Sequence, residues 1–182
     1  MEAVRSGYRT TARVLHWTVA VLVLGMIPAG LAMTTESLPR GVRDMLFIGH
    51  KNAGVLVLAL MLARVAFRLT HKPPPLPASL PPIQRHVAAA THTLLYVVVL
   101  VMAVSGFVRV QAGGFPIEML DALGLPPLVQ RSDAVAETAK RVHFLAHYAV
   151  IGLVALHIAG ALHHALWRRD GLVRRMWPPI AP

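Results

Sequence analysis

Four apolar runs, each at least as long as a lipid bilayer is thick, constrain the fold of this chain more than any other feature. They cover about residues 14–33, 45–65, 86–110 and 142–167. A helix needs roughly 20 such residues to cross about 30 Å of hydrocarbon. Backbone groups in lipid must find their partners within the protein, and none of the runs alternates as a strand would, so each is predicted to be helical. The expected fold class is all-α: an integral membrane four-helix bundle that forms a single transmembrane domain over residues 1–182.

The composition supports a membrane protein and excludes several kinds of site. The chain is 55% hydrophobic and 14% charged, whereas soluble domains are about 45–50% apolar and about 25% charged. Its net charge of +10 lies at the ends of apolar runs rather than on one polar face, which argues against a nucleic-acid partner and for lipid headgroups. The absence of cysteine excludes disulfides, thiolate zinc sites, iron–sulfur clusters and covalent haem attachment.

The distribution of basic residues predicts the orientation in the membrane. Eleven of the 18 Lys and Arg residues fall on the side that holds both termini and the second connection, and seven fall on the other side. The acidic residues divide in the opposite sense, with Glu2 and Asp170 alone on the first side. Both termini are therefore expected in the cytoplasm. The eleven basic residues are Arg5, Arg9, Arg13, Arg64, Arg68, Lys72, Arg85, Arg168, Arg169, Arg174 and Arg175.

The connections differ in character. Residues 69–84 carry a run of prolines and are expected to form an extended cytoplasmic connector. Residues 111–140 form the longest connection, in which Gly113-Gly114 and Pro126-Pro127 surround a short amphipathic piece. This piece is expected to form a re-entrant or surface-lying cap on the outer side.

The fourth run carries five of the ten histidines, and two of them share a helix face. His143 and His157 are 14 residues apart, which at about 100° per residue comes within about 40° of four full turns. At about 1.5 Å per residue the two rings are separated by roughly 21 Å along the helix. One helix therefore offers one nitrogen ligand near each membrane surface, and ionisable groups in membrane helices usually mark function.

Two more histidines lie at matching depths on other runs. His16 opens the first run at the cytoplasmic side, and His50 lies near the outer end of the second. Depth matching pairs His50 with His143 and His16 with His157. Two neutral imidazoles on opposite faces of a porphyrin suit one-electron haem chemistry, whereas zinc usually takes three or four converging protein ligands. The competing interpretation, four packing or interfacial histidines, leaves the matched depths unexplained.

Several segments resemble the bacterial cytochrome b561 family, which is related to the cytochrome b subunits of nickel–iron hydrogenases and formate dehydrogenases. They are ARVLHW, GHKNAGVLVLALMLARVAFRL, THTLLYVVVLVMAVSGF, GGFPIEMLDALGLPPL and VHFLAHYAVIGLVALHIAGALHH, within about Arg9 to Pro178. The resemblance implies a multi-pass protein of the bacterial inner membrane with two b haems. It implies that His16, His50, His143 and His157 are the ligands of the haem iron, in the pairs inferred from depth.

The resemblance also bears on other histidines. His164 lies seven residues after His157, on the same face and about 10 Å nearer the cytoplasm, and it matches a family histidine beside the inner haem, where a quinone is thought to bind. An interfacial role for His164 is the alternative. His92 matches another family histidine and would hydrogen-bond a haem propionate, line the quinone pocket or replace one ligand. His163 is expected at lipid headgroups, and His147 has no family counterpart.

Two basic positions are candidates for contacts with anions. Arg13 lies with other arginines at the cytoplasmic face, where it would either anchor the helix or pair with a haem propionate. Lys51 follows His50 on the outer side, near Arg109, Lys140 and Arg141. Such a basic mouth would steer a small anion, although interfacial snorkelling explains the same residues.

Two functions are expected from this pattern. In the first, the chain is an oxidoreductase that moves electrons from an outer donor, with superoxide the best candidate from the resemblance, through both haems to ubiquinone near His164. In the second, it is a membrane-anchor cytochrome b subunit that relays electrons for a partner redox enzyme docked on the outer loop. A homodimer is one assembly that either function allows.

Overall fold

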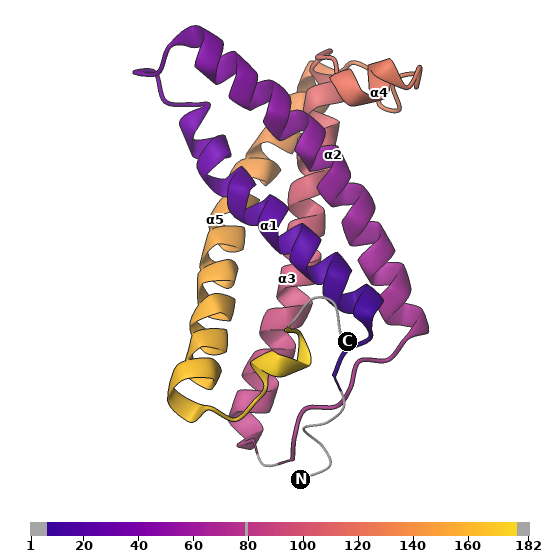
Figure 1. Ribbon diagram of the computed structural model, residues 1–182. Helices are drawn as coiled ribbons and strands as arrows, with labels where there is room; N and C mark the ends of the chain where they lie inside the picture. The colour runs from indigo at the N-terminus through magenta and orange to yellow at the C-terminus, as the bar shows by residue number, and fades with distance from the viewer. Residues whose placement is uncertain (1–6, 79, 178–182) are drawn as a thin grey trace.

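The computed structural model describes residues 7–78 and 80–177, and the described part is helical without a strand. Glu2, Arg5 and Pro178 lie outside the described residues. The long helices are α1 (Thr10–Ala32), α2 (Arg40–Thr70), α3 (Pro82–Ala112) and α5 (Asp133–Leu162) (Figure 1). The short elements are α4 (Glu118–Ala122), the π-helix η2 (His163–Arg168) and the 3-10 helix η3 (Val173–Arg175).

The predicted all-α membrane bundle is confirmed. Four helices of the described chain are long and apolar enough to cross a bilayer, the last of them running from Asp133 to Arg168 through η2. The helices extend several residues beyond the apolar runs, because hydropathy detects only the part in hydrocarbon whereas the helical hydrogen bonds continue into the headgroup region. The added first turn of α2, for example, carries an exposed ion pair between Arg40 and Asp44 at 3.7 Å.

Local sequence determines where the helices begin and end. Pro82 occupies the first turn of α3, where its missing N–H costs no hydrogen bond. Ser132 caps α5 by accepting the backbone N–H of Val135 at 3.4 Å. The backbone N–H of Ser132 also donates to the carbonyl of Ala112 at 2.9 Å, so the end of α3 and the beginning of α5 are joined.

The two ends of the described chain and the proline connector meet at one end of the bundle. Tyr8 N donates to the Arg175 carbonyl at 3.0 Å, and the Trp17 indole donates to the Met176 carbonyl at 2.9 Å. The guanidinium of Arg175 donates to the carbonyl of Pro75 in the connector at 2.9 Å. Helix α4 lies at the opposite end (Figure 1). We call the end where the termini and the proline connector meet the tail end, and the end that carries α4 the cap end.

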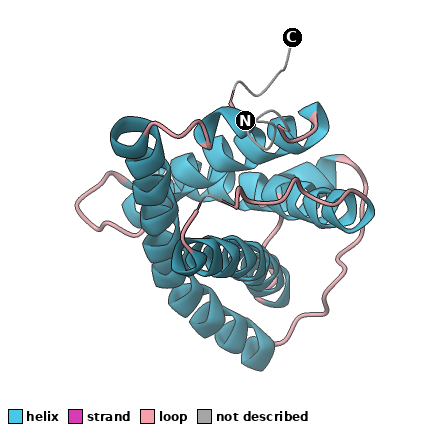
Figure 2. Ribbon diagram, turned by 90° about the horizontal axis from the view of Figure 1, so that it is seen from below, coloured by secondary structure: helices cyan, strands magenta, loops and turns pink. Residues whose placement is uncertain are grey.

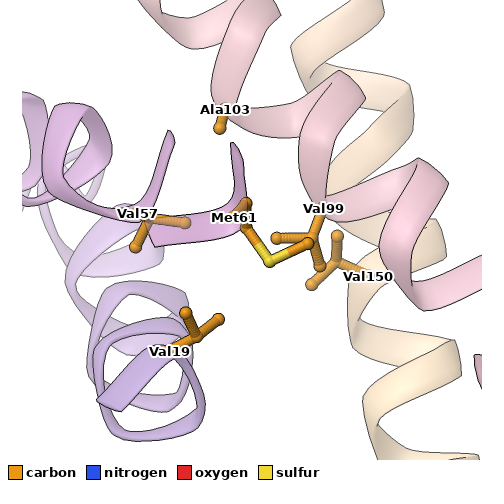
Figure 3. Close-up of a cluster of buried hydrophobic side chains, with 6 residues drawn as sticks. All are labelled: Val19, Val57, Met61, Val99, Ala103 and Val150. Carbon is orange, nitrogen blue, oxygen red and sulfur yellow. The ribbon is translucent and has the colours of Figure 1, made fainter. Parts of the chain in front are cut away.

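The long helices pack as antiparallel neighbours along the chain, with the most extensive contact between α3 and α5, followed by α1 with α2 and α2 with α3. Figure 2 gives the same arrangement from below. A small buried cluster holds all four together (Figure 3). Its members are Val19 of α1, Val57 and Met61 of α2, Val99 and Ala103 of α3, and Val150 of α5. Most other apolar side chains face outward, as expected for helices surrounded by lipid.

Replacing Met61 by Ala is expected to destabilise the bundle by about 2–5 kcal/mol, because Met61 is 2% exposed and its loss leaves a cavity between helices. The neighbouring Leu62 is 56% exposed, so Leu62→Ala is the matched control, with an expected change within about 0.5 kcal/mol. Unfolding in detergent, followed by circular dichroism, measures both. Equal losses for the two variants would contradict this account of the core.

Candidate functional site

Helix α5 brings one histidine to each of two partner helices. His143 of α5 faces His50 of α2, with ring centroids 6.4 Å apart. His157 of α5 faces His16 of α1 at 6.1 Å. The structure therefore places together the same pairs that depth matching selects from the sequence. The first pair lies toward the cap end and the second toward the tail end.

The ring separations fit one metal held between each pair. Two imidazole–metal bonds of about 2.0 Å and two ring radii of about 1.1 Å place the centroids roughly 6 Å apart. The described residues contain no group of three or more His, Cys, Asp or Glu side chains suited to a metal ion. This donor set suits the two axial positions of a planar macrocycle whose other ligands are its own.

The cap-end pair is oriented by α3. Nδ1 of His143 lies 2.9 Å from the carbonyl oxygen of Met102. A carbonyl can only accept, so Nδ1 carries the proton and Nε2 is left free to bind a metal. The hydroxyl of Ser105 lies 3.4 Å from the same Nδ1. Hydrogen bonds at the ring nitrogen that does not bind the metal fix the tautomer and the ring orientation of a ligating histidine.

Glycines make room for both rings of the cap-end pair. A Cβ on Gly30 of α1 would lie 3.1 Å from Cε1 of His50, and a Cβ on Gly106 of α3 would lie 2.9 Å from Cε1 of His143. Contacts this short require the ring or the backbone to move. Gly30 is not predicted as a site residue from the sequence, although its position near the end of the first apolar run matches the depth of His50.

A third histidine adjoins the tail-end pair. The ring of His92 of α3 lies 5.4 Å from that of His157, closer than the roughly 6 Å that a shared metal requires. The separation of 6.1 Å between His16 and His157 fits ligation better. Three histidine rings therefore meet at the tail end, where both His16 and His92 lie beside His157.

Two arginines of α2 also reach the tail-end pair. Nη2 of Arg64 lies 3.3 Å from Nδ1 of His16, and the guanidinium groups of Arg64 and Arg68 lie 4.9 and 5.3 Å from the ring centroid of Tyr96. Arg13 is buried in the first turn of α1, one turn before His16. Arg64 therefore contacts the tail-end pair directly, and Arg68 lies nearby over Tyr96. The sequence groups both with Arg13 at one end of the helices as candidates for contacts with haem propionates.

Lys51 has partners in the connection between α3 and α5 rather than beside the histidine pair. Its ammonium donates to the Pro116 carbonyl at 2.7 Å and to the Glu118 carboxylate at 2.8 Å, and its side chain is 6% exposed. Asn52 completes the contact, because its amide donates to Glu118 and accepts the backbone N–H of Met119, both at 2.8 Å. The hydrogen bond from Lys51 holds the pKa of Glu118 below its ordinary value. These contacts fasten α4 onto α2, as a surface-lying cap requires.

The remaining histidines of α5 and η2 occupy different surroundings. The ring centroids of His147 and Tyr148 lie 3.8 Å apart, and Nδ1 of His147 lies 2.5 Å from the carbonyl oxygen of Phe144. These contacts are all within α5. His163 is exposed. His164 instead lines a cavity of about 480 Å³ at the tail end, and its Nδ1 lies 2.6 Å from the carboxylate of Asp170.

Comparisons with known proteins indicate the family of this chain. The chain matches the family model described as prokaryotic cytochrome b561 over residues 7–179. It is 32% identical over 170 residues to cytochrome b561 homolog 2 of Escherichia coli (strain K12), which covers 93% of this chain and 90% of that protein. It is 26% identical over 168 residues to cytochrome b561 homolog 1 of the same strain, covering 90% and 93%.

Gly106→Ala and Gly30→Ala are expected to lower the haem content of the purified protein, because each new methyl group displaces a ring of the cap-end pair. Gly25→Ala is the matched control, since a Cβ there meets nothing within 4 Å. Haem per protein from the pyridine haemochrome spectrum measures the effect. Full haem content in Gly106→Ala would show that His143 does not need the space that this glycine leaves.

Lys51→Met is expected to loosen the cap, because it leaves the Pro116 carbonyl and Oε1 of Glu118 without the donor that Lys51 supplies. Cleavage by protease within residues 113–132 should then become several-fold faster at neutral pH. Lys140→Met is the control, since Lys140 forms only an exposed pair with Glu137 at 3.3 Å, and such pairs contribute about 0–1 kcal/mol. Equal cleavage rates in the two variants would refute the role of Lys51 in holding α4.

Proposed function

The chain belongs to the prokaryotic cytochrome b561 family of membrane electron-transfer cytochromes, which bind b-type haem, and we propose that it holds two haems and carries electrons between an outer-face donor and the membrane quinone pool. One observation carries this proposal: two histidine pairs with nearly equal ring separations, 6.4 and 6.1 Å, share α5. Haem iron with two imidazole ligands exchanges one electron reversibly. The 14-residue interval on α5 offsets the two pairs by roughly 21 Å along its axis.

Each ligand has a defined task in this proposal. His50 and His143 hold the group nearer the outer face, and His16 and His157 hold the group nearer the cytoplasm. The whole chain, residues 1–182, then acts as one domain of the bacterial inner membrane with both termini in the cytoplasm. The cationic residues at the tail end support that orientation through the positive-inside rule.

Arg64 is the residue most suited to balance the carboxylates of the inner haem. An arginine only donates, so in its contact with Arg64 the Nδ1 of His16 accepts and the proton of that ring sits on Nε2. A metal bound through Nε2 would require the proton on Nδ1, which would end this contact. Arg64 would then be available for a propionate, and Arg13, one turn before His16, is a second candidate.

The enzyme version of this function takes a small anion such as superoxide as donor and ubiquinone as acceptor near His164. The relay version, with the chain as the cytochrome b anchor of a partner enzyme, is favoured by a separate observation. The outer loop exposes several large apolar side chains, namely Phe115, Leu123, Leu125 and Leu128. Exposed apolar patches of this kind mark docking surfaces.

Haem quantification on histidine variants tests the ligand assignment. The wild-type protein is expected to contain two b haems, seen as the α-band of the reduced-minus-oxidised spectrum. His50→Ala and His157→Ala should each retain one, because each loses one axial ligand. His92→Ala is the matched control on α3 and should retain both. One haem in the wild type, or loss of a haem in His92→Ala with none lost in His157→Ala, would contradict this assignment of the haem ligands.

The donor and the partner are tested on the same protein. Reduction of the haems by superoxide, followed by their reoxidation with a short-chain ubiquinone, supports the enzyme version. A stoichiometric periplasmic redox protein that co-purifies supports the relay version, and it should be lost when Leu125 and Leu128 are replaced by Ser. Failure of both measurements would refute both versions.

A further inference from the structure

The end of α5 departs from ordinary helical geometry at His164. The chain winds as a π-helix from His163 to Arg168, a form that is rare and frequent at functional sites. Arg169 follows with φ 48°, the one non-glycine residue of the described chain in the left-handed region, and Gly171 has φ 78°. A non-glycine residue is held in this region only where its surroundings require it. The two features together turn the chain back toward its own helix.

This turn brings one carboxylate against one histidine. Oδ2 of Asp170 lies 2.6 Å from Nδ1 of His164 and 3.5 Å from Nε of Arg168, while Oδ1 accepts the backbone N–H of Leu172 at 3.2 Å. Both side chains are largely buried, with 20% of His164 and 23% of Asp170 exposed. Burial pushes the pKa of Asp170 upward, but the hydrogen bonds from His164 and Leu172 and the charge of Arg168 hold it below its ordinary value. Asp170 is therefore a carboxylate at neutral pH.

The contact fixes the tautomer of His164. A carboxylate only accepts, so the proton of the neutral ring sits on Nδ1 and Nε2 keeps its lone pair. His164 and Asp170 both line the cavity of about 480 Å³, together with Arg169, Gly171, Val173 and Arg174. A histidine held in this way by a carboxylate is suited to take a proton on Nε2 and pass it on, because the carboxylate balances the charge of the imidazolium.

We propose that Asp170 is the positioning residue of the cytoplasmic quinone site, where it holds His164 in the tautomer that delivers protons to the quinone. This inference rests on the proposed function, which supplies the electrons. The quinone takes two electrons from the protein, and its two carbonyl oxygens take two protons, so hydroquinone is the product. His164 first takes a proton on Nε2 from the cytoplasmic water that reaches this end of the bundle and then passes it to a quinone oxygen, and one further round supplies the second proton.

The test compares Asp170→Asn with wild type and with Asp44→Asn, a control in which the same change removes an exposed pair at the far end of the molecule. Pre-reduced protein is mixed with a short-chain ubiquinone or with ferricyanide, which accepts electrons without protons. Asp170→Asn should slow reoxidation by the quinone about ten-fold or more, as losses of such supporting contacts do. Reoxidation by ferricyanide and haem content should not change, and Asp170→Glu should recover part of the quinone rate.

A second readout does not depend on turnover. In protein labelled with ¹⁵N-histidine, with His164→Gln to assign the signal, wild-type His164 should carry its proton on Nδ1. Asp170→Asn should move it toward Nε2. An Nε2–H tautomer in the wild type, an unchanged quinone rate in Asp170→Asn, or equal slowing with ferricyanide would each overturn the inference. If the wild-type protein reduces no quinone, the proposed function fails and this role with it. If the wild type reduces quinone and Asp170→Asn does so at the same rate, only the role of Asp170 is refuted.

Discussion

The position of both histidine pairs depends on the rigidity of one helix, α5. Because α5 supplies a ring to each pair, the offset between the pairs follows from the rise per residue and not from the packing of separate elements. The extensive contact with α3 keeps α5 in place, and the hydrogen bond from His143 to the Met102 carbonyl sets the rotation of the ring at the cap end. Helices α1 and α2 then need only present His16 and His50 at the right heights.

The two ends of the bundle handle charge differently. At the cap end the basic side chains of Lys51, Lys140 and Arg141 each contact a carboxylate, Glu118 or Glu137. At the tail end, Asp170 is the only acidic side chain among the described residues. Arg64 and Arg68 there lie over the ring of Tyr96, and Arg64 also contacts His16. Anionic groups of a cofactor or lipid therefore meet more available positive charge at the tail end, which agrees with the orientation proposed for the membrane.

The sequence predicts the helices and the histidine pairs because both depend on local periodicity and on depth in the membrane. It does not predict contacts that join distant positions. Lys51 meets Glu118 across 67 residues, and nothing in the apolar pattern indicates that pairing. The contact of His164 with Asp170 depends on a π-helix and on the left-handed Arg169, and neither has a strong signal in composition. Hydropathy likewise fixes the helix ends only to within a turn or two, since it ignores the polar turns at the headgroups.

The 14-residue interval of α5 recurs on the other three long helices. His16 and Gly30 of α1, His50 and Arg64 of α2, and His92 and Gly106 of α3 are each 14 residues apart, so every helix contributes one position to each level. At the cap end the residues beside the two histidines are glycines, which leave space against the rings. At the tail end the corresponding residues are Arg64 and His92, which lie against His16 and His157. The two levels thus share one framework but differ in surroundings: glycines lie against the rings at the cap end, and an arginine and a third histidine lie against them at the tail end.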